Sequence, residues 1–78
     1  MVFKCFYCKR RLKYLASIGI EKHEHEEHHY TLYYCDKCGI IYQVETIFYL
    51  DFEDKPIRFE DRVKEVGKLN LEALDVYP

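Results

Sequence analysis

The sequence predicts a small α+β domain in which a three-stranded antiparallel sheet is followed by one C-terminal helix. Three observations lead to this fold class. Two Cys-x-x-Cys pairs lie in the first half of the 78 residues, aromatic and β-branched residues gather between and after them, and apolar residues at helical spacing come last. We therefore expect a single domain over 1–78, with the sheet in 1–50 and a helical extension in 51–78 that packs on the sheet.

The cysteine pairs predict a metal site that stabilises this domain. The cysteines of the chain are Cys5, Cys8, Cys35 and Cys38. Two residues between thiolates let one tight turn direct both sulfurs at the same point, and two such turns supply the sulfur tetrahedron of a structural zinc. Because a chain of this size gains only about 3 to 5 kcal/mol from its apolar core, one structural Zn²⁺ is expected to hold the fold together.

Disulfides, a redox pair and iron are the alternatives to zinc. Residues 1–12 mix basic and apolar side chains and lack the apolar run of a secretory signal, so a cytoplasmic protein with free thiols is expected. A thioredoxin-like redox site uses one such pair in a larger fold. Iron is the strongest rival, because rubredoxins also use two Cys-x-x-Cys turns. However, Lys9 replaces the glycine after their first turn, and the chain contains no tryptophan.

Alternating apolar and polar residues predict the strands. They are expected over 9–18, 30–34 and 40–50, after a short strand over 2–4. In the first of them, Leu12 and Tyr14 share an apolar face, and basic residues lie on the other face. The run 21–29 contains only Glu, His and Lys, so it predicts an exposed hairpin tip or a short helical turn between the first two strands.

A proline separates the third strand from the predicted helix. Pro56 lacks the N–H that a central strand requires. Beyond it, apolar residues recur at i, i+4 and i+7 and a C-capping glycine follows, at Phe59, Val63, Val66 and Gly67. This pattern predicts a helix over 57–66. Its apolar stripe is expected to cover the sheet, and the apolar residues of 69–76 are expected to extend that packing.

Basic residues gather near the N-terminus and predict a nucleic-acid contact. The formal net charge is only −2, but the stretch up to Lys13 contains five basic residues and no acid. Side chains two apart on a strand project the same way, so Lys9, Arg11 and Lys13 are expected to form a row of cations that meets phosphates. The neighbouring aromatics Phe6 and Tyr7 are expected to stack on bases.

A run of histidines and glutamates matches a catalytic motif. His25-Glu26-Glu27-His28-His29 reads His-Glu-x-x-His, in which two histidines bind a catalytic zinc and the glutamate acts as base. Because the run contains only Glu, His and Lys, its composition alone produces this match readily. The run also supplies neither a third ligand nor a cleft. We expect a solvated tip, or weak secondary metal binding by its histidines, and no catalytic residue, enzymatic activity or small-molecule substrate. No apolar run approaches the roughly 18 residues of a transmembrane helix, so no membrane contact is expected.

With these features in place, residues 3–49 resemble a zinc ribbon, a fold found in transcription factors, small RNA polymerase subunits and several ribosomal proteins. The likeness is strongest to the ribbon of transcript-cleavage elongation factors. Those ribbons also follow the first cysteine turn with a basic run, here Lys9-Arg10-Arg11. They also close with Cys-x-x-Cys-Gly-x-x-aromatic, here ending at Tyr42.

The resemblance implies a role for the hairpin tip and a kind of partner. In the cleavage factors an acidic pair at the tip enters the polymerase active site and helps to hold a catalytic metal, and Glu26 and Glu27 stand at the corresponding place. The leading hypothesis is a non-enzymatic zinc ribbon that binds nucleic acid or a polymerase- or ribosome-associated protein. A structural or protein-interaction module that uses the C-terminal helix is the alternative. A rubredoxin-like iron electron carrier is the third hypothesis.

Overall fold

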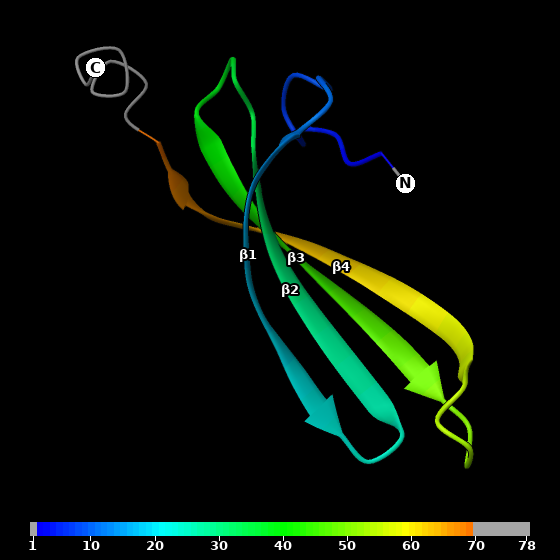
Figure 1. The fold of residues 1–78 in the computed structure, drawn as a ribbon. Helices are drawn as coiled ribbons and strands as arrows, with labels where there is room; N and C mark the ends of the chain where they lie inside the picture. The colour runs from blue at the N-terminus through cyan, green and yellow to red at the C-terminus, as the bar shows by residue number, and fades with distance from the viewer. Residues whose placement is uncertain (1, 70–78) are drawn as a thin grey trace.

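A four-stranded antiparallel sheet makes up most of the fold (Figure 1). The computed structural model describes residues 2–69, and its strands are β1 (Lys13–His23), β2 (Glu26–Tyr34), β3 (Ile40–Leu50) and β4 (Pro56–Lys68). Each strand pairs with the next strand in the sequence, so the order across the sheet is β1-β2-β3-β4. Within residues 2–69 there is no helix, and hence none that is long and apolar enough to cross a membrane.

β3 is a central strand of the sheet and carries much of its core. Alternate residues Ile40, Tyr42 and Val44 are buried on one face, with exposed fractions of no more than 6%. Ile47 is buried on the opposite face, where it pairs with His28 of β2. The N-terminal loop covers the first face where β3 begins, and the core there contains Cys5, Leu12, Cys35, Ile40 and Tyr42. The best-packed part of the molecule is therefore the end that holds the cysteines.

The helix predicted over 57–66 is wrong, because this stretch lies in the fourth strand. Phe59 and Val63 lie opposite Phe48 and Val44 of β3. A helix on the face of the sheet would leave the outer backbone N–H and C=O groups of β3 without partners, whereas β4 supplies those hydrogen bonds. The described part of the chain is thus all-β, in place of the α+β class that the sequence predicted.

The turn before β4 explains how the chain reverses at this point. Asp51 Oδ1 accepts hydrogen bonds from the N–H groups of Glu53 and Lys55 at 2.8 and 2.9 Å. This side chain replaces backbone partners in a tight loop, as aspartate often does in turns. Pro56 then begins an outer strand, where a missing N–H is tolerated. The packing predicted for 69–76 falls almost entirely on residues 70–78, which lie outside the described residues.

β1 begins at Lys13, not at residue 9 as predicted. Leu15 and Ile18 are extra residues without a partner in β2, so the pairing register shifts at each of them. Every such bulge moves the following side chains to the other face of the sheet. The faces predicted from strict alternation over 9–18 are therefore wrong beyond Tyr14.

Bulges are confined to the two outer strands. β4 has two extra residues of its own, Ile57 and Val66, whereas β2 and β3 pair without interruption. The extra residues of both outer strands, including Leu15 and Ile18, are apolar and exposed. The central pair thus keeps a continuous register, whereas the bulges are expected to increase the local twist of both flanking strands.

The predicted hairpin tip exists but is shorter than expected. Of the run 21–29, only Glu24 and His25 form the turn, and the flanking residues belong to β1 and β2. His25 takes a left-handed conformation with φ of 63°, which the third residue of a tight β-turn can adopt. The N–H of Leu50 donates to the carbonyl oxygen of His25 at 2.9 Å, so the end of β3 supports the tip.

Candidate metal centre

Two loops with the same hydrogen-bond pattern carry the cysteines. In the first, the N–H of Lys9 donates to the carbonyl oxygen of Cys5 at 3.1 Å, and in the second the N–H of Gly39 donates to that of Cys35 at 2.8 Å. The N–H of the first cysteine in each loop also donates across the loop, at 2.9 and 3.0 Å. Lys9 and Gly39 hold equivalent places, with φ of 65° and 71°. The missing glycine after Cys8 therefore does not prevent the turn.

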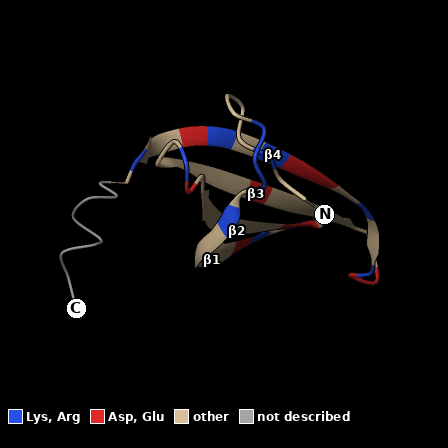
Figure 2. Ribbon diagram, turned by 90° about the horizontal axis from the view of Figure 1, so that it is seen from above, with Lys and Arg blue, Asp and Glu red and all other residues tan. Residues whose placement is uncertain are grey.

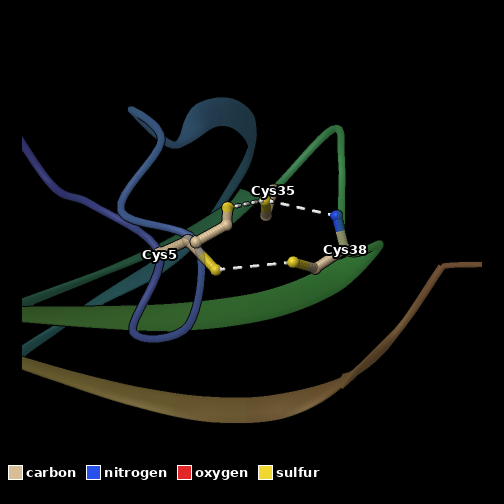
Figure 3. Close-up of side chains that lie close together, drawn as sticks. Cys5, Cys35 and Cys38 are labelled. Carbon is tan, nitrogen blue, oxygen red and sulfur yellow. Dashed lines mark hydrogen bonds between the residues drawn. The ribbon is translucent and has the colours of Figure 1, made fainter.

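These loops bring the four sulfurs to one point (Figure 3). Cys5 Sγ lies 3.9 Å from Cys38 Sγ, Cys8 Sγ lies 3.4 Å from Cys35 Sγ, and all the sulfurs lie within 4.8 Å of one another. Sulfurs about 2.3 Å from a shared tetrahedral ion would be about 3.8 Å apart, whereas a disulfide would join two of them at about 2.05 Å. All four cysteines are free. The predicted single four-cysteine site is therefore confirmed as a geometry that could hold one metal ion.

The electrostatics of the sulfurs also fit a cation. Burial raises the pKa of the Cys5 thiol, but hydrogen bonds from the N–H groups of Cys8 and Tyr7 and from the Tyr42 hydroxyl outweigh it and lower that pKa to about 6. Contact with the Cys8 sulfur, together with burial, raises the pKa of Cys38 to about 12. Neighbouring thiolates repel one another, so all four sulfurs become charged together only with a cation among them. An all-sulfur tetrahedron accepts zinc or iron.

An ion pair ties the first cysteine loop to the second. Asp36, between the second pair of cysteines, has its Oδ2 3.1 Å from Lys13 Nζ and its Oδ1 3.3 Å from Arg10 Nε. The hydrogen bond from Lys13 and the charges of both basic residues outweigh burial and lower the pKa of Asp36. The sequence contained no signal for this contact, because its partners are far apart in the chain.

The three basic residues predicted to share a strand do not form a straight row. Lys9 lies in the first cysteine turn, where its Nζ donates to the Phe6 carbonyl oxygen at 3.0 Å. Arg11 pairs with Lys4 in an isolated bridge, and Lys13 begins β1 beside Asp36. The regular spacing expected of a strand is therefore wrong, and their contact with nucleic acid stays a prediction.

The two aromatic residues predicted to stack on bases lie beside the metal site. Phe6 is 47% exposed and packs edge-on against the Tyr42 ring, with ring centroids 4.8 Å apart. Tyr7 is 65% exposed, and its hydroxyl donates to Glu65 Oε2 of β4 at 3.3 Å. Both rings keep open surface next to the cysteine loops, although Tyr7 also lies beside an acid.

The histidine run lies in a turn and a strand, and its histidines contact carboxylates. His25 and His29 would meet at one metal only on a helix, whereas positions four apart on a strand are about 13 Å apart. His28, with a side chain 14% exposed, places Nδ1 2.7 Å from Glu45 Oε2 and Nε2 3.0 Å from Glu26 Oε2. In residues 2–69, the cysteines are the one group of three or more potential ligands placed to share a metal ion.

The site and the sheet together define a class of protein. A four-cysteine cluster beside a small antiparallel sheet is consistent with a zinc-ribbon-like fold, and the chain is a small module with one four-cysteine site for a metal ion. No protein-family model, curated protein or solved structure matches the chain.

Proposed function

We propose that the chain is a small, non-enzymatic, cytoplasmic zinc-ribbon protein that binds one structural Zn²⁺ and contacts nucleic acid with the loops around it. The observation that carries the proposal is the cluster of four sulfurs within 4.8 Å of one another. Protein ligands fill all the positions of a tetrahedron, which suits a structural ion better than a catalytic one. Elemental analysis of the purified protein should give about one equivalent of zinc, and the visible colour of a ferric tetrathiolate would contradict the zinc assignment.

The charge around the cysteine loops supports a phosphate-bearing partner. Within residues 2–69, ion pairs involve neither Lys4, Lys9 and Arg11 of the first loop nor Lys37 of the second. Figure 2 shows basic residues gathered on the N-terminal loop, whereas β4 carries both signs. Asp36 is the one acid among the loop residues 2–12 and 35–39. Cations without a neighbouring acid attract phosphates and release counterions when they bind them.

The test is a titration of labelled single-stranded and duplex RNA and DNA at several salt concentrations. Three phosphate contacts to a single strand should give a slope of about −2 in log K against log salt. A variant with Lys9, Arg11 and Lys37 changed to alanine should lose this binding. A variant with Lys22, Lys55 and Lys64 changed to alanine removes the same charge from two strands and from the β3–β4 turn, away from the cysteine loops, and should keep this binding. Equal binding by the two variants, or no binding by wild type at about 50 mM salt, would contradict the nucleic-acid role.

A protein-interaction module is the second candidate. It is favoured by an apolar groove on the face of the sheet that carries Tyr42 and Val44, where Thr46 and Phe48 follow on β3. The groove has a volume of about 340 Å³ and is lined by Phe3, Tyr33, Thr46, Phe48, Phe59 and Asp61. The helix that the sequence offered for this role is replaced by β4. A photo-crosslinking residue at position 59 should then capture one defined protein that the same residue at position 53, in the β3–β4 turn, does not capture.

A further inference from the structure

The hydroxyl of Tyr42 connects the two halves of the metal centre. Tyr42 follows the second cysteine loop on β3, and its side chain is fully buried. Its oxygen lies 3.3 Å from Cys5 Sγ and 3.2 Å from the backbone nitrogen of Phe6, both in the first loop. A residue that supplies no metal ligand thus contacts a ligand sulfur and the backbone beside it.

The direction of these hydrogen bonds follows from the chemistry of the partners. The Phe6 N–H can only donate, so the phenol oxygen accepts from it. Within residues 2–69, Cys5 Sγ is the other polar atom in hydrogen-bond contact with the Tyr42 hydroxyl. A sulfur bound to a metal is a thiolate without a proton and can only accept. The geometry therefore directs the phenol proton at the sulfur.

We propose that Tyr42 is a positioning residue of the metal centre, whose hydroxyl donates a hydrogen bond to the metal-bound Cys5 thiolate. This inference rests on the proposed metal-binding function. The bond fixes the direction of one ligand and draws part of its negative charge away from the metal. Hydrogen bonds from other residues to the metal ligands commonly tune both the affinity for the ion and the electron density at sulfur.

A single substitution isolates the hydroxyl. Tyr42→Phe removes one oxygen and keeps the ring that packs edge-on against Phe6. Tyr33→Phe is the matched control, because Tyr33 pairs with Tyr42 across β2 and β3 and packs against the same core. In the described part of the chain, the Tyr33 hydroxyl forms no hydrogen bond.

Two measurements on the full chain test the proposal. Competition with a chelator gives zinc affinity, which should fall about 10- to 100-fold in Tyr42→Phe and stay at the wild-type value in Tyr33→Phe. Cobalt(II) loaded in place of zinc gives a sulfur-to-metal charge-transfer band. This band should shift in Tyr42→Phe, because its energy depends on the electron density at the sulfurs. A variant that is merely less stable does not move this band once it is loaded and folded.

The outcomes separate the inference from the function on which it rests. Failure of the wild type to bind zinc or cobalt would reject the metal-binding proposal itself. If the wild type binds both and Tyr42→Phe shows the wild-type charge-transfer band, Tyr42 does not donate to the thiolate, whatever happens to affinity. A shifted band with weaker zinc binding, found in Tyr42→Phe and absent from Tyr33→Phe, supports the positioning role.

Discussion

At Lys9 the backbone takes a conformation that favours glycine, with φ of 65°. A side chain with a Cβ costs about 1 to 2 kcal/mol in this region. The hydrogen bond from Lys9 Nζ to the Phe6 carbonyl oxygen is exposed and offsets only part of that cost. The first cysteine loop is therefore strained relative to the second, in which Gly39 holds the equivalent place.

Lys9→Gly should raise the unfolding free energy of the zinc-loaded protein by about 1 kcal/mol, because it relieves this strain. Chemical denaturation measures the change. Lys9→Ala is the matched control, since it removes the amine and keeps the Cβ. A glycine variant no more stable than the alanine variant would show that the turn carries no strain.

The contacts of His28 with two carboxylates make the stability of the fold depend on pH. Both ring nitrogens face carboxylate oxygens, at 2.7 Å from Glu45 and 3.0 Å from Glu26, so the doubly protonated ring suits the site. Hydrogen bonds to Glu26 and then Glu45 raise the pKa of His28, although burial opposes them. A folded-state pKa above the unfolded value means that this contact stabilises the fold fully below the unfolded pKa and is lost as the pH rises through the folded pKa.

The zinc-loaded protein should therefore lose stability as the pH rises from about 6 through the raised pKa of His28, relative to a His28→Gln variant. Thermal unfolding of both proteins across this range measures the difference. Metal binding to thiolates strengthens with rising pH in both proteins, so the comparison removes that effect. Parallel profiles for wild type and His28→Gln would contradict the prediction.

At the scale of the elements, the prediction from the sequence differs most from the structure at β4, where a helix was predicted. Phe59 and Val63 are four residues apart, a spacing that shares a face in a helix and also in a strand. Val66, at i+7, would share that face only in a helix, and therefore favours the helix prediction. In the structure it is a bulged residue. The deciding factor lies outside the segment, in the unpaired outer edge of β3.

A double-mutant cycle across β3 and β4 tests this pairing. Thr46 Oγ1 donates to Asp61 Oδ1 at 2.7 Å, between residues that are opposite in the register. Thr46→Val and Asp61→Ala should each destabilise the protein, with a coupling energy of about 0.5 to 1.5 kcal/mol between them. Additive effects in chemical denaturation would argue against the strand. The cycle of Thr46→Val with Glu53→Ala in the turn should show no coupling.

The predictable parts of the molecule are those that a few adjacent residues determine. Two thiolates separated by two residues dictate a turn by themselves, so the pairs at Cys5 and Cys35 predicted the site correctly. The bulges at Leu15 and Ile18 and the ion pairs of Asp36 depend on partners far along the chain. Local patterns do not encode such partners, and this is why the row of cations was misplaced while the metal ligands were not.

For the molecule as a whole, the candidate metal centre is part of the hydrophobic core. The buried Tyr42 and Ile40 belong to the same cluster as Cys5 and Cys35. Zinc bound by such sites contributes roughly 10 to 16 kcal/mol at neutral pH, more than the stability expected of the remaining core. Loss of the ion should therefore loosen the sheet from the cysteine end.

Cys5→Ser and Cys38→Ser, one from each loop, should each lower bound zinc well below one equivalent and resemble the zinc-free wild type. Elemental analysis gives the metal content, and amide hydrogen exchange reports the opening of β3. Similar effects are expected because each substitution removes one ligand of the same ion. A variant that keeps a full equivalent of zinc and the wild-type protection would show that the sulfurs do not form one site.

The bulges of β1 and β4 hinder the addition of further strands at the two edges of the sheet. An outer strand exposes a row of backbone donors and acceptors that invites another chain to add on and begin a fibre. Here the row is interrupted twice on each side, at Leu15 and Ile18 and at Ile57 and Val66. An incoming straight strand would lose its hydrogen-bond register at each interruption. We therefore expect that strands of other copies do not extend the sheet, although apolar side chains line both of its margins.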